Sequence, residues 1–331
     1  MRDIERPVAA RILVCDDISE VGLEGLFRAG LDVQRRAGIR EDELFRRVGD
    51  VDALLVRSRT RVDAELIAAG GRLRLIGRAG FGSANIDLDA ATEAGIAVVH
   101  SPEGNSVSAG EYVIGMLFNL ARHIPAADAS LRQGRWEKRR YRGIELRGKT
   151  LGVIGMGRVG KAVVELASAL QLRVLVHDPQ VPAARIREAG GTAASWDDLL
   201  GQSDFLTVHV PASETTVGLI NEDSFHRMKD RVRFINCSRG GVVDERALLH
   251  ALRTGKVAGA AVDALEGLPE PGHPLLQMPQ VIVTPQLLAS TFEAQINVAR
   301  SLAEQVVAFF ERGEVSPVNP GVLGRLRSSP A

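Results

Sequence analysis

Three glycines in a short stretch have the spacing of a dinucleotide-binding turn. An apolar run is followed by Gly155, Gly157 and Gly160 in the pattern G-x-G-x-x-G, with Arg158 and Val159 between the last two. In this pattern the first glycine permits a tight turn, the second lets the backbone approach a pyrophosphate, and the third lets a helix pack closely on a strand. Amides at the start of that helix then bind phosphate oxygens.

An acidic residue lies where such a turn needs one to select its ligand. The next apolar run ends at His177 and delivers Asp178 about 20 residues after the glycines. Its carboxylate would accept hydrogen bonds from the adenosine ribose and would repel a 2′-phosphate, so NAD is favoured over NADP. The alternative, a glycine-rich turn without a ligand, is disfavoured because the strand, the helix and the acid are all in place.

The elements that position these residues alternate along the whole chain. Helical patterns separate short apolar runs, and this βαβα rhythm predicts an α/β fold with parallel sheets and helices on both faces. Longer helices are expected over residues 106–122 and 291–312. The second half has the six strands of a complete dinucleotide-binding domain. The expected strands are residues 11–16, 52–57, 73–77, 96–100, 151–154, 173–177, 205–208, 233–236, 259–262 and 281–283.

Bulk composition excludes several classes of function. The 331 residues suffice for two domains, and the 41 basic and 41 acidic side chains cancel. Cys15 and Cys237 are the only cysteines, which indicates neither a disulfide framework nor a metal site. The first residues lack a signal-peptide core, and no apolar run approaches the ~20 residues that span a bilayer. We therefore expect a cytoplasmic protein that binds no metal, membrane or nucleic acid.

Further motifs extend the pattern beyond the glycine turn. They are Val56-Arg57-Ser58, Arg78-Ala79-Gly80-Phe81-Gly82, Pro102-Glu103-Gly104-Asn105, Gly134-Arg135-Trp136-Glu137 and Asn236-Cys237-Ser238-Arg239-Gly240-Gly241. With these motifs the chain resembles the D-isomer-specific 2-hydroxyacid dehydrogenases from about residue 14 to 319, and most closely the short 3-phosphoglycerate dehydrogenase-like members.

The resemblance implies an architecture and a cofactor. It implies two Rossmann-like domains: an NAD-binding domain of residues 104–288 inserted into a flavodoxin-like substrate domain of residues 1–103 and 289–331. It also implies a homodimer formed through the cofactor domain. The chain ends where short family members end, so no regulatory domain is expected.

The same resemblance assigns roles to individual residues. Arg239 would grip the substrate carboxylate and polarise the C2 oxygen, although a surface arginine after a strand is the alternative reading. Amides around Gly80 and Gly82 would also bind the carboxylate. Cys237 is expected to pack near the nicotinamide and not to act as a nucleophile, since no activating motif is evident. The remaining substrate residues are Arg57, Ser58, Phe81 and Asn105, and the remaining cofactor residues are His209, Val210, Pro211 and Asp263.

Three positions depart from the family pattern. Gln286 stands where the family has its proton-exchanging histidine, and an amide does not titrate near neutral pH. Leu268 stands where the partner carboxylate is usual, with Glu266 and Glu270 on either side, and Leu288 replaces a small residue. His100 is the best compensating histidine, although it is also read as a half-exposed loop residue. His273 is expected to face solvent.

Three functions therefore remain open. The leading one is an NAD-dependent oxidoreductase that acts on a small anionic 2-hydroxy or 2-oxo acid, with phosphorylated and phosphonylated acids among the candidates, and that uses a rearranged proton relay. The second is an NAD-binding sensor or scaffold with little turnover. The third is a non-redox reaction, such as an elimination, with tightly held NAD.

Overall fold

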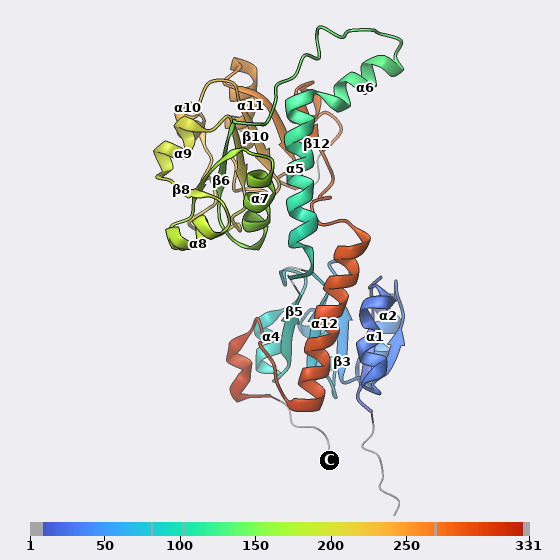
Figure 1. Cartoon of the computed structure of the whole chain (residues 1–331). Helices are drawn as coiled ribbons and strands as arrows, with labels where there is room; N and C mark the ends of the chain where they lie inside the picture. Colours follow the sequence, from blue (N-terminus) through green and yellow to red (C-terminus); the bar gives the residue numbers. More distant parts are fainter. Residues whose placement is uncertain (1–8, 81, 102, 268–269, 327–331) are drawn as a thin grey trace, which may run out of the picture. The chain divides into compact units, whose positions relative to one another are not determined.

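The chain divides into two compact units. The computed structural model describes residues 9–80, 82–101, 103–267 and 270–326. One unit comprises Met1–Asn105 with Thr291–Ala331, and the other comprises Ser106–Ser290 (Figure 1). The domain boundaries expected after residues 103 and 288 each lie two residues before those found here.

The first unit contains a five-stranded parallel sheet in the order β2-β1-β3-β4-β5, the flavodoxin-like order. The four strands expected from sequence are present, and β2 is additional. Local pattern offers little sign of β2, because Asp-Val-Gln-Arg is polar and forms an edge strand with no fully buried residue. The strands are β1 (Arg11–Val14), β2 (Asp32–Arg35), β3 (Ala53–Val56), β4 (Leu75–Arg78) and β5 (Ala97–His100).

Helices cover both faces of this sheet, and one of them comes from the far end of the chain. Helix α12 was expected over residues 291–312 and is found there, with Thr291 as its N-cap. A Cβ at Gly22 would lie 2.4 Å from that of Ala299, so glycine is what lets α1 and α12 approach so closely. The helices are α1 (Glu20–Arg28), α2 (Glu41–Val48), α3 (Ala64–Ala69), α4 (Leu88–Glu93), α12 (Phe292–Arg312), and the 3-10 turns η1 (Glu103–Asn105) and η3 (Pro320–Gly324).

The second unit contains a seven-stranded parallel sheet. Its order is β12-β11-β10-β9-β6-β7-β8. Strands β6 to β11 have the dinucleotide-binding order, and β12 is added at the edge next to β11. The six strands expected from sequence are present, and the two-residue edge strand β8 is additional. The strands are β6 (Thr150–Ile154), β7 (Arg173–His177), β8 (Thr192–Ala193), β9 (Phe205–Val208), β10 (Val232–Asn236), β11 (Val257–Val262) and β12 (Val281–Val283).

Apolar clusters lie on both faces of this second sheet, as a doubly covered parallel sheet requires. Helix α5 has the bounds expected from sequence. Helix α6 was not expected, and with residues 133–148 it connects α5 to β6 (Figure 1). The helices are α5 (Ser106–Arg122), α6 (Ile124–Arg132), α7 (Arg158–Ala169), α8 (Ala183–Glu188), α9 (Trp196–Gln202), α10 (Glu222–Arg227), α11 (Glu245–Thr254) and the 3-10 turn η2 (Pro274–Gln277).

Across the described residues, every helix is too short or too polar to span a bilayer.

Candidate active site

The glycine turn has the geometry of a pyrophosphate cradle. Gly155 has φ +90°, and a Cβ there would lie 2.8 Å from Val210 Cγ1. A Cβ at Gly160 would lie 2.0 Å from the Gly155 carbonyl oxygen, so helix α7 can start here only with glycine. Gly157 is the N-cap of α7 without a side-chain cap, and a Cβ there would meet nothing within 4 Å. The backbone is therefore open where a diphosphate would approach, so these residues fit a dinucleotide.

Asp178 is fixed beside this turn, directly after β7. One carboxylate oxygen accepts the Met156 amide at 2.7 Å, and the other accepts the Gln180 amide at 2.9 Å. A carboxylate oxygen has two lone pairs, so each retains one for a ribose hydroxyl. Asp178 is therefore tied to the glycine turn and still able to bind a ribose.

The predicted residues of this unit gather at one edge of its sheet. The glycine turn follows β6, Asp178 follows β7, and His209 follows β9. Strand order reverses between β6 and β9, and such a switch point at the carboxyl ends of the strands is where α/β sheets bind ligands. The segments with Arg239, Asp263 and Gln286 follow the neighbouring strands β10, β11 and β12.

Buried polar groups organise the segment before Arg239. Asn236, the last residue of β10, accepts the Ser238 amide at 3.2 Å and the Ser238 hydroxyl at 2.8 Å. Arg239 follows with an exposed side chain. Burial, followed by the nearby Asp263 carboxylate, raises the pKa of Cys237 well above its usual value, so its thiol stays protonated. A nucleophilic role for Cys237 is thereby disfavoured.

His209, which is predicted to line the cofactor pocket, is uncharged at neutral pH. Burial lowers its pKa to about 4. One ring nitrogen, Nε2, lies 3.0 Å from the Thr207 hydroxyl. Its carbonyl oxygen would lie 2.9 Å from a Cβ at Gly155, which places His209 and Val210 against the glycine turn.

Gln286 sits in a tight turn held by Asp263. Its φ of +54° lies in the left-handed region, which is unusual for a residue other than glycine. The next two amides, of Leu287 and Leu288, each donate to one oxygen of the buried Asp263 carboxylate at 2.8 Å. Asp263 Oδ1 also accepts the Thr284 hydroxyl at 2.6 Å. Both oxygens of a residue expected to bind cofactor are therefore engaged by the protein itself.

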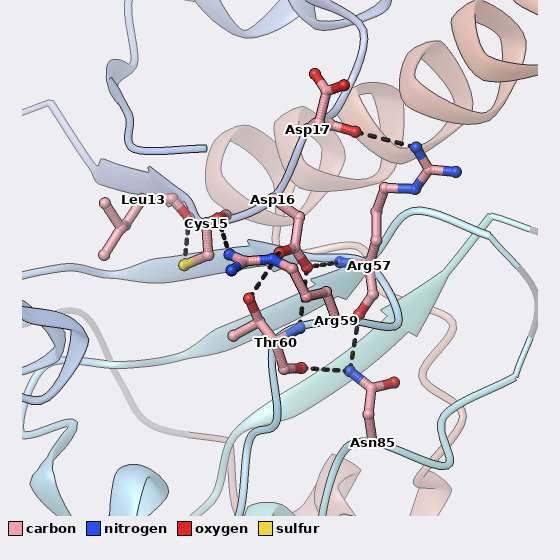
Figure 2. Close-up of polar contacts among 8 residues, drawn as sticks. All are labelled: Leu13, Cys15, Asp16, Asp17, Arg57, Arg59, Thr60 and Asn85. Atoms are coloured by element: carbon pink, nitrogen blue, oxygen red, sulfur yellow. Dashed lines mark hydrogen bonds and ion pairs between the residues drawn. The ribbon is translucent and has the colours of Figure 1, made fainter. Parts of the chain in front are cut away.

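In the first unit, the predicted substrate loop wraps around another buried carboxylate. Asp16, 3% exposed, accepts the Arg57 amide at 2.6 Å, the Arg59 guanidinium at 2.9 Å and the Thr60 hydroxyl at 2.7 Å (Figure 2). The Asn85 side chain donates to the carbonyl oxygens of Arg57 and Thr60 at 2.8 and 2.6 Å. The loop that presents Arg57 and Ser58 is therefore held from both sides.

The Asp16 carboxylate stays ionised despite its burial. Burial by itself raises its pKa, but the hydrogen bonds from Arg57, Thr60 and Arg59 outweigh that effect. Its pKa therefore lies below the ordinary value of 3.8.

The other predicted residues of this unit also follow strand ends. Gly80 and Gly82, after β4, have φ of +127° and +88°, a backbone that only glycine adopts readily. His100 is the last residue of β5 and is half-buried, and Gln305 of α12 donates to its carbonyl oxygen at 3.0 Å. Asn105 is the last residue of η1, which begins three residues after the end of that strand. Strands β3, β4 and β5 are neighbours, so these residues share one edge of the sheet.

Two predicted positions, Phe81 and Leu268, lie outside the described residues. Glu266 has an exposed side chain, and its amide donates to Glu245 at 2.7 Å. The expectation that His273 faces solvent is wrong, because its Nε2 lies 3.1 Å from Glu245 Oε2 and its side chain is 22% exposed.

Sequence reasoning missed the residues that hold the site in shape. Asp16, Asn85 and Thr284 were not assigned to it, although each contacts a predicted loop. One signal was available: Asp16 lies two residues after the buried strand β1 and Asp263 directly after β11, where a carboxylate must find donors or remain unsatisfied.

Comparisons with known proteins agree with the fold. The profile of the D-isomer specific 2-hydroxyacid dehydrogenase NAD binding domain matches residues 114–287. A D-3-phosphoglycerate dehydrogenase of Archaeoglobus fulgidus is 47% identical over 298 residues, covering 90% of this chain and 56% of its own length. The solved structure of the TT0316 protein from Thermus thermophilus is 31% identical with a TM-score of 0.79, covering 93% of this chain and 99% of that one. The pyruvate reductase of Chlamydomonas reinhardtii is 28% identical with a TM-score of 0.80, covering 91% and 96%.

The glycine turn, the acid after β7 and the strand order define a dinucleotide-binding α/β protein. The chain belongs to the D-isomer-specific 2-hydroxyacid dehydrogenase family. The expectations of two Rossmann-like domains and of NAD as the cofactor are confirmed. The chain spans about half the length of the curated relatives it matches.

Proposed function

We propose that the chain moves a hydride between bound NAD and C2 of a small 2-hydroxy or 2-oxo acid that carries a phosphate at its distal end. The observation behind this proposal is the shared carboxyl edge of the second sheet, where the glycine turn, Arg239 and the Gln286 turn follow strands of one parallel sheet. Relatives named D-3-phosphoglycerate dehydrogenase support the phosphorylated acid.

Each charged end of the substrate has a proposed partner. The planar Arg239 guanidinium suits two parallel hydrogen bonds to a carboxylate, assisted by the amides around Gly80 and Gly82. The distal phosphate is assigned to Arg57, whose loop is preformed on Asp16. Ser58 and Asn105 are the remaining proposed donors.

Two roles that one histidine has elsewhere in the family, hydrogen-bonding the C2 oxygen and exchanging its proton, are proposed here for Gln286 and His100 respectively. The Gln286 amide would hydrogen-bond the C2 oxygen but cannot exchange its proton, so we assign proton exchange to His100. A positioned general acid or base contributes about 10²- to 10⁴-fold in rate. His100→Asn should therefore lower turnover by at least about 10²-fold and flatten the pH–rate profile. A profile unaffected by this change would show that another group carries the proton.

The central test is turnover followed by NADH absorbance against a panel of 2-oxo acids with and without a phosphate. Arg239→Ala should abolish acid binding and leave NAD binding nearly intact. Arg253→Ala, an exposed arginine on α11, is the matched control. Absence of turnover with every acid, while NAD still binds, would favour the cofactor sensor or the non-redox reaction over the dehydrogenase.

Cofactor preference tests the assignment of Asp178. The wild-type protein should bind NAD much more tightly than NADP, because the carboxylate would meet the 2′-phosphate. Asp178→Ala should reduce the difference between the affinities for NAD and for NADP. Calorimetry measures both affinities, and equal affinities for the parent protein would contradict the assignment.

We also propose that the second unit forms a homodimer. Several large apolar side chains are exposed to solvent on α5, on α6 and on the segment that follows α6. Exposed apolar patches of this kind are typical of surfaces that contact another protein. Trp136→Lys should shift the mass in light scattering to that of a monomer, whereas Val217→Lys, an exposed position elsewhere in the unit, should not. The exposed side chains are Phe118 (40%), Ile124 (52%), Leu131 (56%) and Trp136 (82%).

A further inference from the structure

A chain of hydroxyl groups joins helix α5 to the turn that carries Gln286. The Tyr112 hydroxyl lies 2.6 Å from Thr284 Oγ1, which lies 2.6 Å from Asp263 Oδ1. It also lies 3.1 Å from Asp263 Oδ1 itself. A tyrosine hydroxyl has one proton, so it donates to Thr284 at the shorter distance, and Thr284 in turn donates to the carboxylate.

This chain stabilises a backbone that would otherwise be unfavourable. A residue other than glycine in the left-handed region costs roughly 1–2 kcal/mol, and such a conformation persists where its surroundings determine it. At Gln286 the surroundings are the Asp263 carboxylate, which accepts the next two amides, and the Thr284 carbonyl, which accepts the Gln286 amide at 3.0 Å. Moving Asp263 would release both amides.

Tyr112 is suited to hold Asp263 in place. Burial raises the pKa of Tyr112 well above its usual value, the Thr284 hydrogen bond lowers it, and the Asp263 charge raises it further. The hydroxyl therefore remains a donor throughout the neutral range. Its ring packs beside the apolar core of the second unit, so the hydroxyl is delivered by a rigid helix.

We propose that Tyr112 is a positioning residue that, through Thr284 and Asp263, fixes the left-handed turn presenting the Gln286 amide. The proposal rests on the proposed function, in which Gln286 contacts the acid. It also reassigns Asp263. Its carboxylate was expected to bind the cofactor, and here it acts on the substrate side by shaping the turn.

The experiment compares Tyr112→Phe with Tyr141→Phe, the only other tyrosine in the sequence. The Tyr141 ring stacks on Arg140, a contact that phenylalanine retains. Losing one neutral hydrogen bond should raise amide exchange in peptides covering residues 284–290 by about three- to tenfold in Tyr112→Phe and leave it unchanged in Tyr141→Phe. The kcat of Tyr112→Phe should fall by a similar factor, while KM for the acid and Kd for NAD stay within about twofold.

A double variant tests the order of the chain. In Thr284→Val the Tyr112 hydroxyl can donate directly to Asp263 Oδ1, 3.1 Å away, so adding Tyr112→Phe should raise exchange and lower kcat beyond the single Thr284→Val variant. Unchanged exchange in Tyr112→Phe, or a loss of NAD affinity as the main effect, would overturn the positioning role. The exchange measurement needs no turnover. A parent protein that reduces no acid would therefore count against the proposed function alone, and exchange would still decide the role of Tyr112.

Discussion

The loop after β3 and the turn after β12 are shaped by the same device with different chemistry. In each, an aspartate that follows a buried strand accepts two backbone amides and a threonine hydroxyl: Asp16 in the first unit, Asp263 in the second. Asp16 also accepts a charged donor, the Arg59 guanidinium, whereas the further group beside Asp263 is a neutral hydroxyl, that of Tyr112, which donates to Thr284 and lies 3.1 Å from Asp263 Oδ1.

The difference matches the ligand that each element is proposed to meet. The loop that is proposed to bind phosphate carries two arginines, and Asp16 neutralises Arg59 while it orders the backbone that presents Arg57. The Gln286 turn is proposed to meet an uncharged oxygen, and neutral hydroxyls order it without adding a cation. A buried carboxylate thus fixes an irregular loop in both units, and the additional polar group beside it differs with the ligand that each element is proposed to meet.

The largest expected effect is that of Asp16→Asn. An asparagine can keep both backbone bonds only by turning its NH₂ towards Arg59, so a charge-assisted bond becomes a contact between two donors. We expect a loss of about 2–3 kcal/mol in the unfolding free energy of the first unit. In Asp263→Asn, the asparagine oxygen can replace Oδ1 and keep the bonds from Thr284 and Leu287, so that only the bond from the Leu288 amide is lost. This variant should lower the unfolding free energy of the second unit by about 1–2 kcal/mol.

These two losses need separate probes. Trp136 and Trp196 both lie in the second unit, so fluorescence follows unfolding there. Hydrogen exchange of β1 and β3 peptides follows the first unit. Asp17→Asn, at an exposed neighbouring position, is the control for Asp16→Asn. If Asp16→Asn and Asp263→Asn lowered the unfolding free energy of their units by the same amount, the proposed difference between the two carboxylates would be contradicted.

Acidification should reproduce part of the Asp16 effect. Because the folded-state pKa of Asp16 is depressed, its contribution is present above the ordinary value of 3.8 and is lost as pH falls through the lower folded-state pKa. The stability gap between the parent and Asp16→Asn should therefore be constant near neutral pH and close below about pH 4. Exchange of β1 and β3 peptides across this range measures the gap, and a gap that widens on acidification would contradict the sign.

The smallest expected effects distinguish the two threonines. Thr60→Val removes a hydroxyl donor from Asp16 and should cost about 1–1.5 kcal/mol. Thr284→Val should cost less, about 0.5–1 kcal/mol, because Tyr112 already lies 3.1 Å from Asp263 Oδ1 and can donate to it directly. Denaturant curves read by the same two probes measure both losses. The reverse order would mean that Tyr112 does not replace the lost donor.

Much of the fold was predictable because its signals are local. The ten expected strands are present, and the three glycines have the three environments that the fingerprint requires. Strands β2 and β8 were missed because edge strands need little burial, and neither contains a fully buried residue. Local pattern carries no signal for an element that only backbone pairing stabilises.

The candidate site was less predictable, because its supports come from distant parts of the chain. Nothing near Thr284 in sequence indicates that Tyr112, 172 residues away, donates to it. Likewise, Asp16 lies 41 residues from the Arg57 amide that it accepts. The assignments of Arg239, Gln286, Arg57 and Ser58 to the site remain predictions from motif, whereas the residues that hold their loops emerged only from the packed structure.

The packing of α12 on the first sheet has a consequence for biosynthesis. Leu302, Val306 and Phe309 belong to the same apolar cluster as Val14 and Leu55, so the first 105 residues lack part of their core until α12 has been translated. The second unit is continuous in sequence and is complete at Ser290. During translation the second unit can therefore fold before the first unit is complete. Until α12 has been synthesised, the N-terminal strands expose apolar surface to which a chaperone could bind.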